Sequence, residues 1–206
     1  MDVRAAAGSP EDQAIRHINA INHINGELRH ALNERKNPNA VTTIISELHD
    51  HINNLVELKT KLKSFKVQLG IPMLHDAFQA LLATPTQENL STFARESYQI
   101  GSFLDVPGCK VATDVEGMKV AAYALLKAVR ATDRASANTH MNLLQISMDN
   151  LLAQEPPKNL SDPIRQLNQN FLILESKFPK PLPEDVAEFS KALNEFPPIS
   201  GTYHAA

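Results

Sequence analysis

Apolar residues recur every three or four positions along almost the whole chain, and proline, glycine or a helix-capping residue interrupts the pattern at intervals. This spacing places the apolar side chains on one face of an α-helix. Strict alternation of apolar and polar residues, which would indicate β-strands, is almost absent between Glu11 and Phe196. The sequence therefore predicts an all-α fold, a helical bundle of about eight helices.

The two N-terminal helices are expected to be long and to form an antiparallel hairpin. The first is predicted over residues 11–36 and the second over residues 40–69, with a short turn at 37–39 between them. In the second helix the apolar spacing alternates between four and three, which is a heptad pattern and predicts left-handed coiling. The expected core positions of this helix are Val41, Ile45, Leu48, Ile52, Leu55, Leu58, Leu62, Phe65 and Leu69.

Turn and capping signals divide the rest of the chain into shorter helices. Gly70-Ile71-Pro72 has the residues of a helix end followed by a new first turn. Thr84 and Thr113 each open a capping-box pattern and are expected to be N-caps. These signals predict further helices over residues 72–83, 84–104, 113–129, 134–153, 163–178 and 184–196.

The domain organisation follows from the same signals. Residues 1–10 are expected to be a flexible N-terminus, residues 11–196 a single helical domain, and residues 197–206 an exposed C-terminal tail. A subdivision near residue 70 or near residue 155 is the alternative, because glycine and proline signals cluster there.

Composition and charge exclude several classes of function. The net charge is −3, and acidic and basic residues are balanced in both halves of the chain, so no nucleic-acid partner is expected. One cysteine in 206 residues excludes an intrachain disulfide and is typical of a reducing compartment. The first residues lack the apolar segment of a secretory signal, and no apolar run is long enough to span a membrane. We therefore expect a soluble cytoplasmic protein, or one delivered into another cell by a non-Sec export route.

The candidate metal ligands are four side chains on one strip of the first helix: His23, Glu27, His30 and Glu34. Glu-x-x-His spacing is how four-helix di-iron proteins present ligands from one helix. However, no second helix offers a matching strip, and the four residues lie opposite the apolar stripe. There, Glu and His four residues apart would only stabilise the helix weakly, which is the interpretation that we favour.

No catalytic residue and no cofactor are predicted. The chain has seven glycines and no Gly-rich phosphate loop, paired zinc cysteines or nucleophile-elbow motif. Cys109, ahead of an expected helix N-terminus, could have a lowered thiol pKa. No catalytic signature surrounds it, so we interpret it as a loop cysteine. Glu47 and His51 are interpreted as a surface pair, and His17 as a residue at the edge of an apolar stripe.

The only basic run contains Lys59, Lys61, Lys63 and Lys66. On a continuous helix three of these lysines would flank the heptad stripe, with their stems covering its edge. A patch for anionic lipid or for an acidic partner is the alternative, but four lysines with no aromatic anchor are weak evidence, so membrane binding is disfavoured.

These features favour a non-enzymatic helical protein–protein interaction module, which could be an adaptor, a chaperone-like subunit or a secreted effector acting by contact. Heptad stripes on several helices suit packing against a partner helix. A metal-binding bundle that uses the strip on the first helix is one alternative, and a peripheral membrane protein that uses the lysines is another. The identity of the partner and the oligomeric state do not follow from the sequence.

Overall fold

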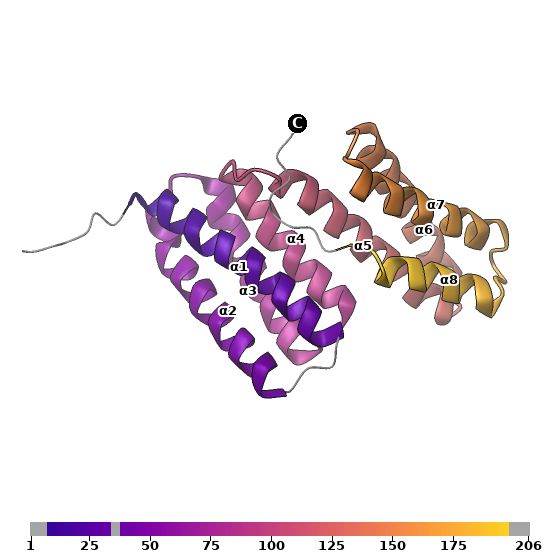
Figure 1. The fold of residues 1–206 in the computed structure, drawn as a ribbon, viewed down its shortest axis with the longest axis horizontal. Coiled ribbons are helices and arrows are strands. Elements are labelled where there is room, and N and C mark those ends of the chain that lie inside the picture. Colours follow the sequence, from indigo (N-terminus) through magenta and orange to yellow (C-terminus); the bar gives the residue numbers. More distant parts are fainter. Residues whose placement is uncertain (1–7, 34–37, 198–206) are drawn as a thin grey trace, which may run out of the picture. The chain divides into compact units, whose positions relative to one another are not determined.

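The computed structural model describes residues 8–33 and 38–197 of the chain. Within these two ranges the protein is built from α-helices and one short 3₁₀ helix, without β-strands, which confirms the expected all-α bundle (Figure 1). The elements are α1 (Pro10–Asn33), α2 (Pro38–Leu58), η1 (Lys59–Lys61), α3 (Phe65–Ala83), α4 (Gln87–Phe103), α5 (Cys109–Arg130), α6 (Arg134–Ala153), α7 (Lys158–Ser176) and α8 (Pro183–Asn194).

Contacts divide the described residues into two compact units, residues 8–113 and residues 114–197. The division falls within α5. Residue 70 lies inside α3 of the first unit, and residue 155 lies between α6 and α7 of the second unit. Neither candidate boundary from the sequence therefore coincides with the division between the units. The single domain expected over residues 11–196 stays a prediction.

Helices α1 to α4 form an antiparallel four-helix bundle in the first unit. The expected hairpin of α1 and α2 is present: the Glu11 carboxylate accepts the backbone N–H of Lys63, and His17 meets His51 further along. Because residue numbers rise along α1 as they fall along the partner segment, the two helices run in opposite directions. α4 packs against both α1 and α3, and α2 packs against α3, which closes the four-helix arrangement (Figure 1).

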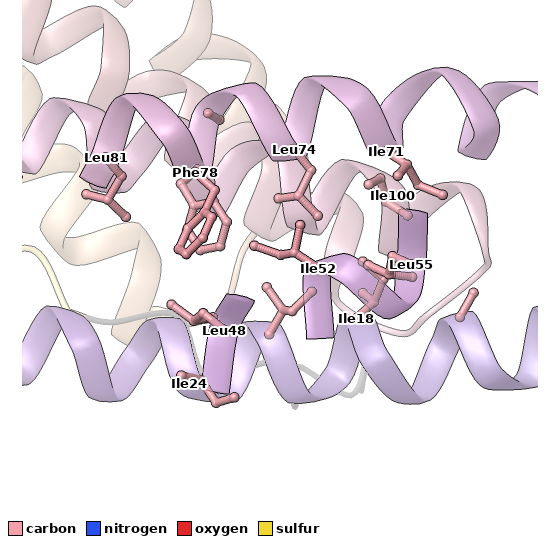
Figure 2. Packing of buried hydrophobic residues seen from close by; sticks show 14 of the residues in the cluster. Ile18, Ile24, Leu48, Ile52, Leu55, Ile71, Leu74, Phe78, Leu81 and Ile100 are labelled. Atoms are coloured by element: carbon pink, nitrogen blue, oxygen red, sulfur yellow. The ribbon is translucent and has the colours of Figure 1, made fainter. Parts of the chain in front are cut away.

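α3 and α4 pack closely and in opposite directions. The Phe78 and Phe93 rings have centroids 5.6 Å apart, and Gly70 lies beside Ile100 at the other end of the contact. Figure 2 shows that the inward face of α3 is directed at apolar side chains from α1 and α2. The core of this unit includes Ile18, Ile21, Ile24, Leu48, Ile52, Leu55, Ile71, Leu74, Phe78, Leu81, Phe93 and Ile100.

The second helix of the sequence prediction is wrong beyond residue 58. The chain passes through η1 and leaves helical geometry at Leu62, and Ser64 caps a new helix by accepting the backbone N–H of Val67. The backbone groups at this break have partners, because the Gln68 amide donates to the Leu62 carbonyl and the Lys63 N–H donates to Glu11. The Ser64 N-cap and the hydrogen bonds to the neighbouring backbone groups therefore start a new helix here, although the heptad spacing continues through the break.

Gly70-Ile71-Pro72 lies inside α3, so the helix boundary that we expected there is also wrong. Gly70 is required for packing: a Cβ built on it would lie 2.9 Å from Cγ1 of Ile100. Pro72 removes one N–H that would have donated to the Gln68 carbonyl, yet the helix continues across it. The burial of Ile71 and Leu74 on either side explains why the helix tolerates this loss.

Three further helix starts differ from the prediction. α4 is capped by Thr86, which accepts the N–H of Asn89, and Thr84 precedes the cap. α5 begins at Cys109, so Thr113 is an internal residue whose hydroxyl donates to the Cys109 carbonyl. α7 begins at residue 158 and includes the proline at 163, which lies in its first two turns. Thr84 is the C-cap of α3, and Thr113 and Pro163 lie inside helices, so the expected helix starts at these three positions are wrong.

In the second unit, α6 packs against α7 and α7 packs against α8. The rings of Phe171 and Phe189 meet between α7 and α8 with centroids 6.5 Å apart, and Tyr123 of α5 bonds Asn194 at the end of α8. The apolar residues of α6 that recur at spacings of four and three are buried: Ala137, Met141, Leu144, Met148 and Leu151. The core consists mainly of Val115, Met118, Ala122, Leu125, Ala137, Met141, Leu144, Met148, Leu151, Leu160, Ile164, Leu167, Phe171, Leu174, Phe189 and Leu193.

A buried ion pair also lies in this unit. Lys119 Nζ is 3.2 Å from Glu116 Oε1, and both side chains are almost completely shielded from solvent. The same ammonium lies 5.6 Å from the centroid of the Phe196 ring, which covers it after α8 ends. A buried charge is tolerated only when it is paired, so these contacts account for a lysine in an otherwise apolar core.

A close helix approach in the first unit involves Gly101 of α4. A Cβ built there would lie 2.5 Å from Cys109 Sγ and 3.3 Å from Cγ2 of Ile18 on α1. Gly26 of α1 is the opposite case, because a Cβ built on it has no neighbour within 4 Å. The two glycines thus differ in whether the surrounding structure leaves room for a side chain.

We predict that alanine has opposite effects at these two glycines. Gly101→Ala should destabilise the fold by about 1–3 kcal/mol, because the added methyl group overpacks the α4 contacts. Gly26→Ala should stabilise it by up to about 1 kcal/mol, because alanine favours the helix and meets nothing. Urea unfolding followed by circular dichroism measures both changes, and a Gly101→Ala protein as stable as the wild type would contradict the packing described.

Candidate functional site

The predicted metal strip on α1 is solvent-exposed. His23 Nε2 and Glu27 Oε1 are 3.7 Å apart, and their side chains are 78% and 52% exposed. His30 is exposed on the same helix, and Glu34 lies outside the described residues. Within residues 8–33 and 38–197, no three His, Cys, Asp or Glu side chains come together as a metal site. Because Glu34 is not included, metal binding by the complete strip stays a prediction.

The structure brings together His17 and His51, a pair that the sequence did not reveal. Their Nδ1 atoms are 3.0 Å apart across the α1–α2 contact, and the ring centroids are 5.3 Å apart. One ring can donate its Nδ1–H to the other only while the acceptor nitrogen is unprotonated. His51 therefore pairs with His17, and the expected surface pair between Glu47 and His51 is not among the described contacts.

The environment of His17 disfavours its charged form. Burial lowers the pKa of His17 below its ordinary value of 6.5, and the nearby positive charges of His51 and Arg16 lower it further. Neutral imidazoles about 3 Å apart could supply two of the ligands of a tetrahedral metal ion. Within the described ranges, however, no third metal-ligating side chain lies close to His17 and His51. We therefore interpret the pair as a hydrogen-bonded contact of the hairpin.

Cys109 does not lie in the loop that the sequence indicated. It is the first residue of α5, is buried, and contacts the Asn22 amide at 3.8 Å. Burial raises the pKa of its thiol to about 11, although the Asn22 contact acts in the opposite direction. A nucleophilic cysteine requires accessible thiolate near neutral pH. Both requirements fail here, so Cys109 is a packing residue.

Lys59, Lys63 and Lys66 do not share the helical face that we expected. Lys59 and Lys61 lie in η1, Lys63 lies in the break, and Lys66 lies in the first turn of α3. The Lys66 ammonium is 5.7 Å from the centroid of the Phe103 ring. These residues form what we call the lysine segment, residues 59–66. Because the chain breaks between α2 and α3, the residues beside the lysine segment differ from those expected in a continuous helix.

Phe65, Leu69 and Met73 form an exposed apolar row on α3, which we call the α3 ridge. Their exposed fractions are 69%, 54% and 53%. Residues four apart form a continuous ridge along a helix, and this one covers about 12 Å. The heptad spacing predicts Phe65 and Leu69 in the core of a longer second helix. Because α3 starts a new helix, its core face uses Val67, Ile71, Leu74 and Phe78.

Acidic side chains adjoin the lysine segment on two sides. Glu57 precedes it and is exposed, and Glu11 of α1 accepts the Lys63 N–H at 2.9 Å. This hydrogen bond holds the pKa of Glu11 below its ordinary value. Four lysines against Glu57, Glu11 and the adjacent Asp12 leave a small local excess of positive charge beside Phe65.

Exposed apolar residues also occur in the second unit. Leu143 and Ile146 of α6 are about half exposed, as are Leu172 and Ile173 of α7. Neither pair lies in a run of lysines like that of residues 59–66. These residues therefore offer a matched comparison for the α3 ridge, because their hydrophobicity is similar but their electrostatic setting differs.

Comparison of the chain with protein-family models, with curated proteins and with solved structures finds no match. None of the helices within residues 8–33 and 38–197 combines the length and apolar character of a transmembrane span. The candidate functional site is the α3 ridge together with the lysine segment, because the fold places this exposed apolar surface beside a cluster of positive charges.

We predict that the His17–His51 contact makes the fold sensitive to acid. Unfolded His17 binds a proton more readily than folded His17, so its contribution to stability is complete at high pH and is lost as pH falls below about 6.5. Stability of the wild type and of His17→Gln should be compared between about pH 7.5 and pH 5. His17→Gln should reduce the dependence of the free energy of unfolding on pH, whereas His23→Gln should not. Equal slopes for the wild type and His17→Gln would contradict this assignment.

We also predict that Cys109 is inert in the native protein. At about pH 8 a thiol-specific reagent should react far more slowly with folded protein than with protein in denaturant, because the folded thiol is buried and protonated. Absorbance of the released reagent group gives both rates. Similar rates in the two states would show that Cys109 is accessible.

Proposed function

We propose that this protein is a non-enzymatic helical protein that works by contact, and that the α3 ridge is its contact surface. The observation that supports the proposal is the exposure of Phe65, Leu69 and Met73 in one row on a helix whose opposite face is well packed. Contiguous exposed apolar residues on a folded protein mark interaction surfaces, whereas scattered ones do not.

The roles of the other reactive groups agree with a function without catalysis. His17 is used in the α1–α2 contact, Cys109 is buried beside Gly101, and Glu116 is paired with Lys119 inside the second unit. Each of these groups has a partner that explains its position. Among the described residues, no contact of this kind accounts for the exposed side chains of the α3 ridge.

The size of the ridge limits the strength of the contact that it can make alone. Covering the exposed parts of three large apolar side chains is worth about 2–5 kcal/mol. Association costs at least as much in lost translational and rotational freedom. The ridge alone would therefore give a weak contact, and a useful affinity requires a second contribution, for which the adjacent lysines are suited.

A single free cysteine suits a reducing compartment. We therefore propose that the protein acts in a cytoplasm, either that of the cell that makes it or that of a cell that receives it.

We predict that native binding depends on the ridge. Phe65→Ser/Leu69→Ser removes most of the exposed apolar surface without entering the core, so the protein should stay folded and lose its binding. Leu143→Ser/Ile146→Ser is the matched control, because it removes similar surface from α6. Tagged wild-type and variant proteins should be used to recover binding material, both protein and membrane, from a native lysate of the source cells. Recovery of the same material by the ridge variant would contradict the proposal.

A further inference from the structure

We propose that the α3 ridge and the lysine segment dock the protein on an anionic membrane surface. This inference rests on the proposed function, because it names the partner of the same contact surface. It follows from the combination of exposed apolar side chains and positive charge within one short stretch of chain.

The apolar part has the form of a membrane-surface helix. Phe65 is the first residue of α3, Leu69 follows one turn later, and Met73 follows after another. At 100° per residue these three positions lie within an arc of about 80°. Peripheral helices insert an apolar face of this kind into the boundary between headgroups and acyl chains. The Phe65 ring also supplies the aromatic anchor that the sequence prediction of a continuous helix had assigned to the core.

The lysines are placed where the headgroups of an inserted ridge would lie. Lys63 and Lys66 lie within two residues of Phe65, and Lys61 is exposed on the preceding η1. Juxtaposed lysines are attracted to the negative potential of anionic lipid. The positive end of the α3 dipole lies at the same point and adds to this potential. The neighbouring Glu11 carboxylate accepts the backbone N–H of Lys63 and stays ionised, so it offsets one of these positive charges.

The distribution of charge favours a membrane over an acidic partner helix. A helix lying along the ridge would need positive charge on its flanks from Phe65 to Met73. The lysines instead gather at the Phe65 end, and the other end is followed by Asp76, whose side chain is 85% exposed. A bilayer responds to local net charge without a fixed register, so it tolerates this one-sided arrangement.

The chain contains no tryptophan, which allows a direct test of insertion. Phe65→Trp gives a protein with one tryptophan, located on the ridge, and Ile146→Trp gives the control on α6. The probes are vesicles of phosphatidylcholine alone and of phosphatidylcholine mixed with phosphatidylserine. With the mixed vesicles, the tryptophan fluorescence of the Phe65→Trp protein should shift to shorter wavelength and be quenched by brominated acyl chains. The fluorescence of the Ile146→Trp control should do neither.

Co-sedimentation of the full-length protein with the same vesicles tests the charges. Each lysine near the surface should contribute about five-fold to the partition coefficient at low salt. Lys61→Gln/Lys63→Gln should therefore weaken binding by about 25-fold, and added salt should weaken wild-type binding. Phe65→Ser/Leu69→Ser should weaken it by at least about ten-fold, whereas Leu143→Ser/Ile146→Ser should leave it unchanged.

Absence of binding to the phosphatidylserine vesicles at low salt would overturn the inference. Equal binding by the ridge variant and the wild type would also overturn it. If vesicles fail while a protein from the native lysate still requires Phe65 and Leu69 for capture, the surface contacts a protein and the proposed function stands. If neither vesicles nor lysate material depends on the ridge, both proposals are wrong.

Discussion

The reversal of the chain between α2 and α3 determines the architecture of the first unit. Ser64 caps α3, and the backbone groups of Leu62 and Lys63 are bonded by Gln68 and Glu11. These interactions allow the chain to turn back, so that α3 buries Val67 against the helices that precede it. If α2 continued, α3 could not close the four-helix arrangement, and the side chains of its outer face would not be displayed as they are.

Close helix packing determines which polar groups are available at the surface. Gly70 and Gly101 let α4 approach its neighbours, and the approach at Gly101 buries Cys109. The α1–α2 contact likewise engages His17 with His51. Cys109 and His17 are thus used in helix contacts. Among the exposed residues of the first unit, the α3 ridge has positive charge at one end, and this arrangement suits the binding that we propose.

The two proposals depend on the same displaced boundary. Lysines alone are common on solvated helix faces, and a single exposed apolar residue has little meaning. Phe65 changes the interpretation because the ring is exposed within the run of lysines, where insertion and electrostatic attraction would reinforce each other. The same residue in a continuous second helix would belong to the core. The binding role that we propose for Phe65 therefore depends on one N-cap.

The sequence by itself determined the all-α class, the N-terminal hairpin and most core stripes, because apolar periodicity reports directly which face of a helix is buried. Residues such as Ile18, Leu48 and Met141 are buried where their spacing predicted. Only the tertiary structure decided that Ser64 begins a helix and that Gly70 lies within one. A serine can cap a helix or lie within one, and a glycine can end a helix or allow close packing inside it. Which of these occurs depends on residues distant in sequence, such as Glu11 and Ile100. The His17–His51 contact and the exposure of the α3 ridge follow from those long-range choices, so the spacing of residues along the chain could not reveal them.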